Sequence, residues 1–210
     1  FNLIELGAGN AAMMKILIES FKKFPLFFKS CRLVIYEISP TLKKIQKKEL
    51  LNSDVNWIND LKKIKKIPSI FVANEFFDAL AIKQFEKKGN LWFEKFVSFN
   101  KKITSFSEKK INMKNYEKKI NFKISKNQNF IEYSELGIDY LKQISKIIKV
   151  RSGGILIIDY GYNENKMKNT LQAIFKHEYS DVLDKIGSSD ITHNINFRLF
   201  EKIIKKLGGL

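Results

Sequence analysis

The sequence predicts an α/β fold, a Rossmann-like parallel sheet with helices on both faces. Three segments predict it, at residues 2–6, 32–37 and 69–73, because each is a short apolar run that leads through a turn or an acidic residue into a helical pattern. Strands that alternate with helices in this way form parallel sheets covered on both faces. The 210 residues can bury a sizeable core, and we assign residues 1–210 to one domain.

The first two strands are each followed by a helix with recognisable signals. The first strand leads through the turn Gly7–Ala8–Gly9 into an amphipathic stretch over residues 11–24. After the second strand, Ser39 can cap a helix over residues 41–51, and Pro40 suits the first turn of that helix. These two strand-to-helix connections are therefore expected at one edge of the sheet.

Later segments extend the sheet and interrupt it. A third strand is expected at residues 55–58, and a helix over 134–149 is followed by the fully apolar strand 155–158. Between them, residues 86–133 are expected to form a β insertion. Within it, extended ribbons at 92–99 and 121–133 flank a loop rich in lysine and asparagine over 107–119.

The net charge of +16 invites a nucleic-acid interpretation, but the kind of basic residue argues against it. Among 38 basic residues, only Arg32, Arg151 and Arg198 are arginines, and arginine usually supplies the bidentate contacts to bases. The lysines are spread along the chain, which indicates a solvated surface. We therefore expect no specific nucleic-acid partner.

Composition excludes two further classes of protein, those that span a membrane with a helix and those held by internal disulfides. No apolar run approaches the roughly 20 residues that a membrane-spanning helix needs, so no membrane span is expected. Cys31 is the single cysteine, so no internal disulfide is possible and a reducing compartment is expected. Because Phe1 already lies in a strand-like run and the chain stops just past a helical pattern, we expect a fragment truncated at both ends.

The glycine turn and two acidic residues predict a nucleotide-type cofactor site. Gly7 and Gly9 let backbone N–H groups approach a ligand closely. Glu37 ends the second strand and can accept hydrogen bonds from ribose hydroxyls, while Asp60, after the third strand, lies where an adenine edge is often bound. The alternatives are a structural turn without a ligand and a surface carboxylate paired with a lysine.

A second polar cluster follows the strand at residues 69–73. Asn74, Glu75 and Asp78 would be costly to desolvate without a partner, and Asp159 ends the last apolar strand. Such acids suit a cation, either a sulfonium or a guanidinium. The structural alternative is a helix N-terminus stabilised by acidic side chains.

NAD and S-adenosylmethionine both use a glycine turn and a ribose carboxylate. Glu5 precedes the first glycine by two residues and favours S-adenosylmethionine, as does the acidic character of the later strand ends. The sequence therefore predicts S-adenosylmethionine as the cofactor, with an NAD-dependent oxidoreductase as the alternative enzyme.

Taken together, these motifs resemble the MidA-type family, which includes a mitochondrial complex I assembly factor that methylates an arginine. The matching stretches are Glu5–Leu6–Gly7–Ala8–Gly9, Tyr36–Glu37–Ile38–Ser39–Pro40 with Leu42 and Gln46, Asn74–Glu75–Phe76–Phe77–Asp78–Ala79–Leu80, Trp92–Phe93–Glu94, Ile158–Asp159–Tyr160–Gly161–Tyr162, His177, and Gly187 followed by Asp190–Ile191–Thr192–His193. The sequence departs from the family at Asn10–Ala11, where further glycine and arginine are usual, and at Ala81, where proline is usual.

The resemblance implies a class I methyltransferase sheet with S-adenosylmethionine as the methyl donor. It further implies symmetric dimethylation of an arginine on a subunit of respiratory NADH dehydrogenase, or on its bacterial counterpart, in support of complex I assembly. A bacterial cytoplasm is the expected compartment, with the mitochondrial matrix as the alternative. A non-catalytic assembly scaffold that keeps the cofactor fold, and a nucleic-acid-binding module, remain the other interpretations.

For catalysis, we expect carboxylates from Glu75, Asp78 or Asp159 to bind the substrate guanidinium and to help remove its proton. His193 is a further candidate proton acceptor, although a structural loop over residues 190–193 is an equal alternative. No metal site is expected, because the two histidines and the single cysteine have no recognisable ligand spacing.

Overall fold

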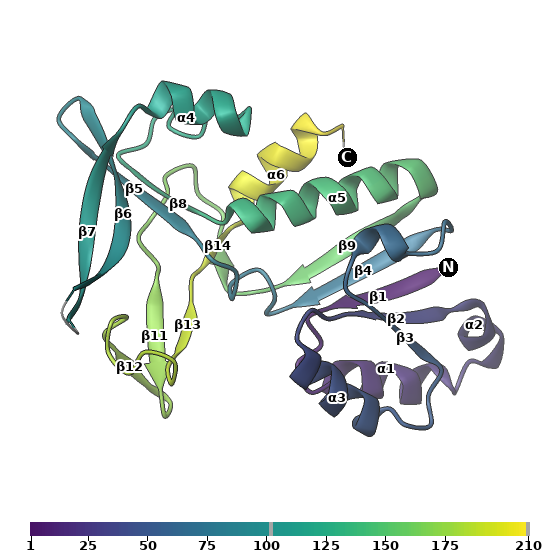
Figure 1. Cartoon of the computed structure of the whole chain (residues 1–210). Coiled ribbons are helices and arrows are strands. Elements are labelled where there is room, and N and C mark those ends of the chain that lie inside the picture. Colours follow the sequence, from purple (N-terminus) through teal and green to yellow (C-terminus); the bar gives the residue numbers. More distant parts are fainter. Residues whose placement is uncertain (101–102, 209–210) are drawn as a thin grey trace. The chain divides into compact units, whose positions relative to one another are not determined.

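The structure, a computed structural model, describes residues 1–100 and 103–208 and consists of two compact units (Figure 1). Unit 1 contains residues 1–76, 140–159 and the chain from residue 204 onward. Unit 2 contains residues 77–139 and 160–203. The boundary at residues 76 and 77 falls inside the motif Asn74–Leu80, so that motif contributes side chains to both units.

Unit 1 is built on a five-stranded sheet with the strand order β3-β2-β1-β4-β9. Its strands are β1 (Asn2–Leu6), β2 (Arg32–Tyr36), β3 (Val55–Ile58), β4 (Ser69–Asn74) and β9 (Gly153–Ile158). Every pairing in it is parallel, which confirms the predicted α/β fold class. The order of strands reverses between β1 and β4, and ligands of such sheets bind at the carboxyl ends of the strands beside this point.

The helices of unit 1 cover both faces of this sheet. They are α1 (Ala12–Phe21), α2 (Pro25–Ser30), α3 (Pro40–Glu49) and, from residue 140 onward, α5 (Glu135–Arg151), with a 3₁₀ turn η1 (Leu61–Lys63). Figure 1 shows α1 and α3 on one face and α5 on the opposite face. As predicted, Ser39 caps α3, since its Oγ accepts a hydrogen bond from the N–H of Leu42 at 3.3 Å. Apolar side chains of α1 and of the first strands form the core, among them Met14, Ile18 and Ile35.

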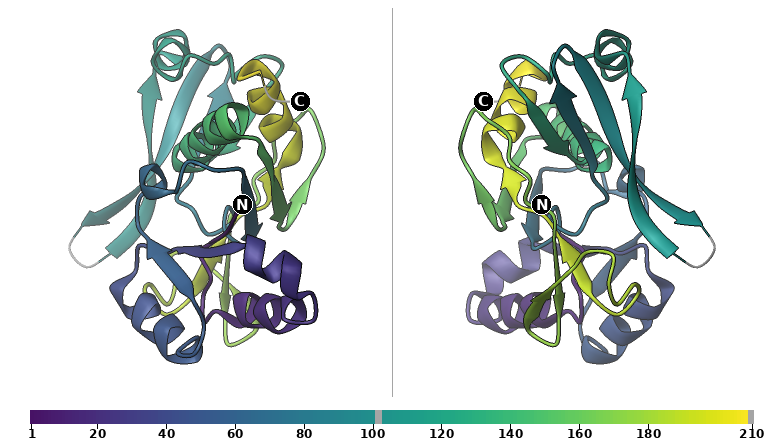
Figure 2. Two further views of the ribbon diagram at one scale, coloured as in Figure 1. Left: turned by 90° about the vertical axis from the view of Figure 1, so that its right-hand side faces the viewer. Right: turned by 90° about the vertical axis from the view of Figure 1, so that its left-hand side faces the viewer.

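A four-stranded antiparallel sheet forms the first part of unit 2, with the order β7-β6-β5-β8. Its strands are β5 (Lys83–Lys88), β6 (Leu91–Asn100), β7 (Ile103–Ile111) and β8 (Phe130–Tyr133), and helix α4 (Met113–Ile120) follows β7. Figure 2 shows β6 and β7 as a long two-stranded ribbon. Where the sequence predicted a loop over residues 107–119, the structure has the end of β7 and then α4.

That prediction was wrong because polar residues were interpreted as loop residues. β7 is an edge strand with its side chains largely exposed, so lysine and glutamate are tolerated on both of its faces. Asn112 begins α4 as its N-cap, with Oδ1 accepting from the N–H of Asn115 at 3.1 Å. The predicted ribbon over 121–133 is likewise a strand only at Phe130–Tyr133.

Short strands and one helix complete unit 2. They are β10 (Gly161–Tyr162), β11 (Gln172–Phe175), β12 (Glu178–Ser180), β13 (Asp190–Thr192), β14 (Ile195–Asn196) and, up to residue 203, α6 (Phe197–Lys206). Phe77, Phe85, Ile131 and Ile195 are buried in the core of this unit. In the described part of the chain, no helix combines the length and the apolar character that crossing a membrane requires.

Candidate cofactor and active site

The glycine turn follows β1 and has two glycines in different surroundings. Gly7 and Gly9 have φ angles of 63° and 52°, in the left-handed region that favours glycine. A Cβ atom on Gly7 would lie 2.7 Å from the ring of Phe76, whereas a Cβ on Gly9 would meet nothing within 4 Å. Gly7 is therefore needed for packing, and Gly9 leaves open space beside the backbone.

The departure at Asn10–Ala11 does not prevent the turn from closing. Ala11 adopts the left-handed conformation with a φ of 69°, and its N–H donates to the carbonyl of Ala8 at 2.6 Å. The Oδ1 atom of Asn10 accepts a hydrogen bond from the N–H of Ala12 at 3.1 Å, at the start of α1. Ala11 thus takes a conformation that glycine would adopt without steric cost.

Glu5 lies inside β1, with its carboxyl group against the first turn of α1. The side chain is buried, and this burial raises the pKa of Glu5 from 4.5 to about 7, opposed by a hydrogen bond from the backbone of Met14. Among the described residues, Oε2 of Glu5 has no hydrogen-bond partner. The carboxyl group therefore contacts the N-terminus of α1 directly, and a role in cofactor binding stays a prediction.

Glu37 is part of a hydrogen-bonded network that joins the ends of three strands. Its Oε1 accepts from the N–H of Ser39 at 2.8 Å, and its Oε2 accepts from Nε2 of Gln46 at 2.8 Å. The same Nε2 donates to the carbonyl of Gly9 at 3.0 Å, and Nε1 of Trp57 donates to Oε1 of Gln46 at 3.0 Å. One amide on α3 thereby holds the glycine turn, the carboxylate after β2 and the indole on β3.

Gln46 was not among the predicted site residues, although a signal for it exists. The side chain is fully buried on a helix whose neighbouring positions are mostly lysine. Leu42, Gln46 and Leu50 are spaced four residues apart, which places them on one helix face. A glutamine in such an otherwise apolar stripe indicates a buried hydrogen-bonding role.

Asp60 follows β3 and caps the short turn η1. Its Oδ1 accepts a hydrogen bond from the N–H of Lys62 at 2.9 Å, and the residue is half-buried. The structure thus gives Asp60 a capping role, and contact with an adenine edge stays a prediction.

Asn74, Glu75 and Asp159 lie at the adjacent carboxyl ends of β4 and β9. Asn74 is paired with Ile158, and the N–H of Glu75 donates to the carbonyl of Ile158 at 2.9 Å. Glu75 is exposed and has a φ of 45°, a conformation that is uncommon for non-glycine residues and concentrates at functional sites. Among the described residues, the half-buried amide of Asn74 makes no side-chain hydrogen bond, so it is available to a ligand.

Asp78 and His193 belong to unit 2, where the structure brings them together. Both are buried, and the N–H of His193 donates to the carbonyl of Asp78 at 3.1 Å. Nδ1 of His193 lies 3.4 Å from the carbonyl of Asn194, while Nε2 has no partner among the described residues. A cavity of about 10 Å³ beside His193 is large enough for about one water molecule.

Glu132 holds the segment that contains His193, and no motif in the sequence pointed to this residue. Its Oε1 accepts from Oγ1 of Thr170 at 2.5 Å, and its Oε2 accepts from Gln84 at 2.6 Å. Oγ1 of Thr170 in turn accepts from the N–H of Asn194 at 2.8 Å. Asn194 thus donates to Thr170, which donates to Glu132, and this chain of hydrogen bonds fixes the backbone next to His193.

The described residues fit S-adenosylmethionine better than a metal ion. Within them, no group of three or more His, Cys, Asp and Glu side chains could hold a metal. The open space at Gly9, the buried carboxylate of Glu37 and the unbonded amide of Asn74 lie at ends of strands of one sheet. Hydroxyl and amino groups of an adenosine derivative are the donors that such acceptors bind.

Comparison with known proteins supports the same conclusion. The family of S-adenosyl-L-methionine-dependent methyltransferases matches residues 1–210. The chain is 25% identical, over 97% of its length, to mouse "Protein arginine methyltransferase NDUFAF7, mitochondrial". It is 27% identical over 98% of its length to the homologue from Caenorhabditis elegans. The chain spans about half the length of these relatives, 52% and 53%.

Two crystal structures of proteins from Burkholderia thailandensis have the same fold. The first matches 99% of this chain and 57% of its own chain with a TM-score of 0.78 at 17% identity. The second, solved with S-adenosyl-homocysteine bound, matches 99% of this chain and 56% of its own with a TM-score of 0.77 at 17% identity. The family match over the whole sequence confirms the resemblance: the chain belongs to the S-adenosyl-L-methionine-dependent methyltransferases, and S-adenosylmethionine is the family's cofactor.

Proposed function

We propose that this chain is the cofactor-binding part of a protein arginine methyltransferase. The names of its relatives support an arginine substrate. The family resemblance extends the proposal to symmetric dimethylation of an arginine on a respiratory complex I subunit, or on its bacterial counterpart, in support of assembly. A bacterial cytoplasm is the proposed compartment, although the curated relatives are named as mitochondrial.

The hydrogen-bonded network of Glu37, Gln46 and Gly9 is the main support for this proposal. Each oxygen of Glu37 accepts one internal hydrogen bond and so keeps acceptor capacity for the ribose hydroxyls of the cofactor. Gly7 and Gly9 would admit the methionine end, Asp60 would contact the adenine edge, and Asn74 would hydrogen-bond the cofactor at the end of β4.

S-adenosylmethionine, when bound, supplies a methyl group on a positively charged sulfonium. An arginine side chain is protonated at neutral pH and attacks poorly in that form. Carboxylates of Glu75, Asp78 and Asp159 would bind the guanidinium, orient one nitrogen and take up the proton that attack releases. Nε2 of His193 is the further proposed proton acceptor.

Calorimetric titration of the chain with S-adenosylhomocysteine, and separately with NADH, tests the cofactor. We expect micromolar binding of S-adenosylhomocysteine that Glu37→Ala abolishes. Glu49→Ala is the matched control, since Glu49 lies on the same helix but is exposed and pairs only with Lys15 at 3.5 Å. Binding of NADH alone would support the oxidoreductase instead, and binding of neither would support a non-catalytic scaffold.

Methylation of the NADH dehydrogenase subunits of the same organism tests the substrate. The double variant Glu75→Gln, Asp78→Asn is expected to bind S-adenosylhomocysteine normally but to lose methyl transfer. Unchanged methylation by this variant would contradict the proposed role of the carboxylates.

A further inference from the structure

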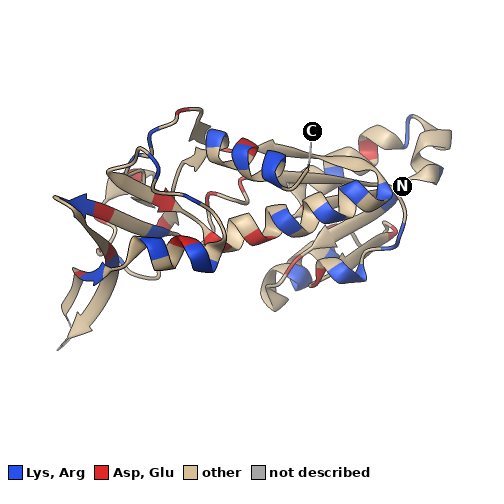
Figure 3. Cartoon of the chain, turned by 90° about the horizontal axis from the view of Figure 1, so that it is seen from above, with Lys and Arg blue, Asp and Glu red and all other residues tan. Residues whose placement is uncertain are grey.

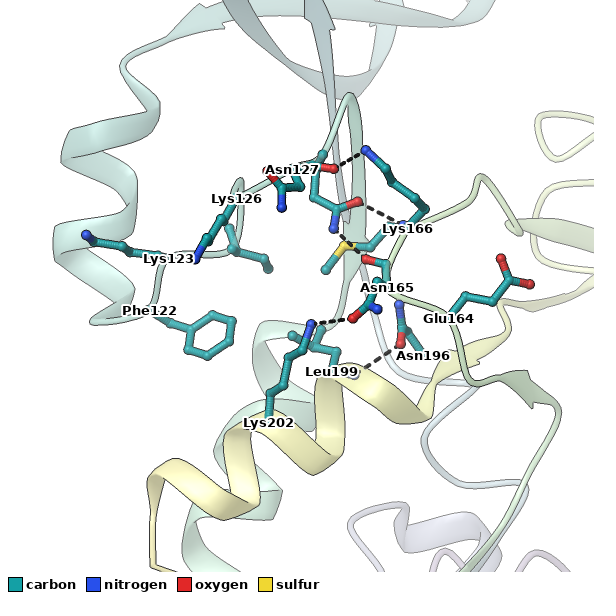
Figure 4. A pocket seen from close by; sticks show the side chains of 13 residues that line it. Phe122, Lys123, Lys126, Asn127, Glu164, Asn165, Lys166, Asn196, Leu199 and Lys202 are labelled. Carbon is teal, nitrogen blue, oxygen red and sulfur yellow. Dashed lines mark hydrogen bonds between the residues drawn. The ribbon is translucent and has the colours of Figure 1, made fainter.

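Unit 2 contains a cavity of about 490 Å³ that shares no residue with the proposed cofactor site. Its walls are the segments 122–128 and 164–167 together with the first turns of α6, as Figure 4 shows. Ile124 and Leu199 are buried, and with the half-buried Met167 they form an apolar floor. A hollow of this size can take one or two side chains of another molecule.

Four lysines surround this floor: Lys123, Lys126, Lys166 and Lys202. In the described part of the chain, none of the four forms an ion pair with a carboxylate. Lys202 donates to Oδ1 of Asn165 at 2.9 Å, and Lys166 donates to the carbonyl of Asn127, so their observed partners are neutral. The carboxylate that lines the cavity, Glu164, is paired with Lys168 at 2.5 Å. The cavity therefore has an uncompensated positive charge.

Hydrogen bonds hold the segments 122–128 and 164–167, which form two walls of the cavity, in a fixed arrangement. Gln128, which is buried, donates through Nε2 to the carbonyl of Asn165 at 2.6 Å and accepts from the N–H of Met167 at 2.9 Å. Asn196 caps α6, with Oδ1 accepting from the N–H of Leu199 at 3.0 Å. The cavity is thus preformed, which lowers the entropic cost of binding.

From these contacts we infer that the cavity binds an acidic segment of a partner protein. An apolar side chain of that segment would cover the floor at Leu199 and Met167, and flanking carboxylates would pair with the four lysines. Lysines lie on elements of both units (Figure 3), so charge alone selects no site. This cavity is distinguished by an apolar floor next to lysine ammonium groups that form no ion pair with a carboxylate among the described residues. The inference does not depend on methyl transfer.

The lining disfavours the two other common anionic partners. Nucleic-acid sites usually combine arginine with several stacking aromatics, but the described lining has no arginine and Phe122 as its one aromatic residue. Binding to a lipid surface needs apolar side chains that protrude, whereas Ile124 and Leu199 are buried. An acidic peptide with an apolar residue satisfies both the charge and the floor.

Calorimetric titration of the chain with a synthetic hexapeptide, leucine at its third position and glutamate elsewhere, tests the inference. Lys123→Glu with Lys126→Glu is expected to weaken binding by about tenfold, because two attractions become repulsions. The matched control is Lys22→Glu with Lys23→Glu, which makes the same change of net charge at two exposed lysines of unit 1. It is expected to change the affinity by less than about twofold.

A peptide with serine in place of leucine, and the variant Met167→Ser, test the apolar floor. Each is expected to weaken binding by roughly fivefold, the effect of losing part of one buried apolar side chain. Equal weakening by both charge variants would overturn the inference in favour of non-specific attraction. Tighter binding of oligothymidylate, lost in the Lys123 and Lys126 variant, would overturn it in favour of nucleic acid. Normal binding of S-adenosylhomocysteine by every variant shows that folding and the proposed cofactor site are intact.

Discussion

The two units place their polar residues in different ways. In unit 1, most residues of the proposed cofactor site lie at or just after the ends of strands of one parallel sheet, so neighbouring strand ends bring them together. In unit 2, Asp78 and His193 are far apart in the sequence and meet through a backbone hydrogen bond. The first arrangement depends on local pattern and strand order, and the second on contacts between loops. Variants of matched residues can test whether this difference has functional consequences.

The largest effect is expected from two buried glutamines, one in each unit. Gln46→Leu would remove the hydrogen bonds that Gln46 makes with Oε2 of Glu37, the carbonyl of Gly9 and the indole of Trp57. We expect a loss of S-adenosylhomocysteine affinity on the order of 100-fold, measured by calorimetry. Gln128→Leu should instead weaken binding of the acidic hexapeptide and leave binding of S-adenosylhomocysteine unchanged. If both variants affected both ligands alike, the two sites would not be independent.

A pH-dependent effect is expected from Glu5 in unit 1. Burial raises its pKa in the folded chain above the unfolded value, so the folded state holds the proton more tightly. The contribution of Glu5 to the free energy of unfolding is therefore present at low pH and is lost as the pH rises from about 4.5 to about 7. The raised pKa corresponds to at most about 3 kcal/mol.

Glu5→Gln should remove this dependence and raise the free energy of unfolding at pH 8. Denaturant unfolding of both proteins at pH 5, 6, 7 and 8 measures the difference. Identical pH profiles for the two proteins would show that the carboxyl group is not desolvated. Glu49→Gln, at an exposed carboxylate of the same unit, is the control.

Substitutions in the glycine turn should separate packing from ligand binding. Gly7→Ala brings a Cβ to 2.7 Å from Phe76 at a positive φ and should cost about 2 kcal/mol of stability. Gly9→Ala meets no atom within 4 Å, so its stability cost should stay near 1 kcal/mol. Its cofactor affinity should nevertheless fall, because the added methyl occupies the open space beside the turn. A larger stability loss for Gly9→Ala would refute this division of roles.

The smallest effect is expected at Ala11. Ala11→Gly removes the steric cost of a left-handed conformation. It also removes a buried methyl group and increases the conformational entropy of the unfolded chain. These contributions oppose one another, so the free energy of unfolding should change by less than about 1 kcal/mol. Thermal unfolding measures it, and a gain well above that value would show that the turn is strained.

Much of unit 1 could be predicted from the sequence because its signals are local. The apolar runs of β1 and β4, the glycine turn after β1 and the cap at Ser39 each occupy a few consecutive residues. Gln46 was missed because a polar residue on a lysine-rich helix is expected at the surface. Its burial depends on Glu37 and Trp57, which lie on other elements.

Unit 2 was harder to predict for physical reasons. β7 is exposed on both faces and has no alternation of apolar and polar residues, so its lysines and serines were interpreted as a loop. The strands within residues 161–196 have two to four residues each, too few for a periodic pattern. Glu132 holds Thr170 from a distant segment, and no single stretch of sequence carries that information.

The two tryptophans of the chain fall one in each unit. Trp57 donates its indole N–H to Gln46 and has Nζ of Lys47 at 5.8 Å from its ring centroid, whereas Trp92 is buried in β6 of unit 2. Replacing Trp92 with phenylalanine would leave Trp57 as the single tryptophan, hydrogen-bonded to Gln46 in the network around Glu37. Tryptophan emission, excited at a wavelength that the seven tyrosines do not absorb, would then report on the parallel sheet, and the reciprocal variant would give unit 2 a spectroscopic signal of its own.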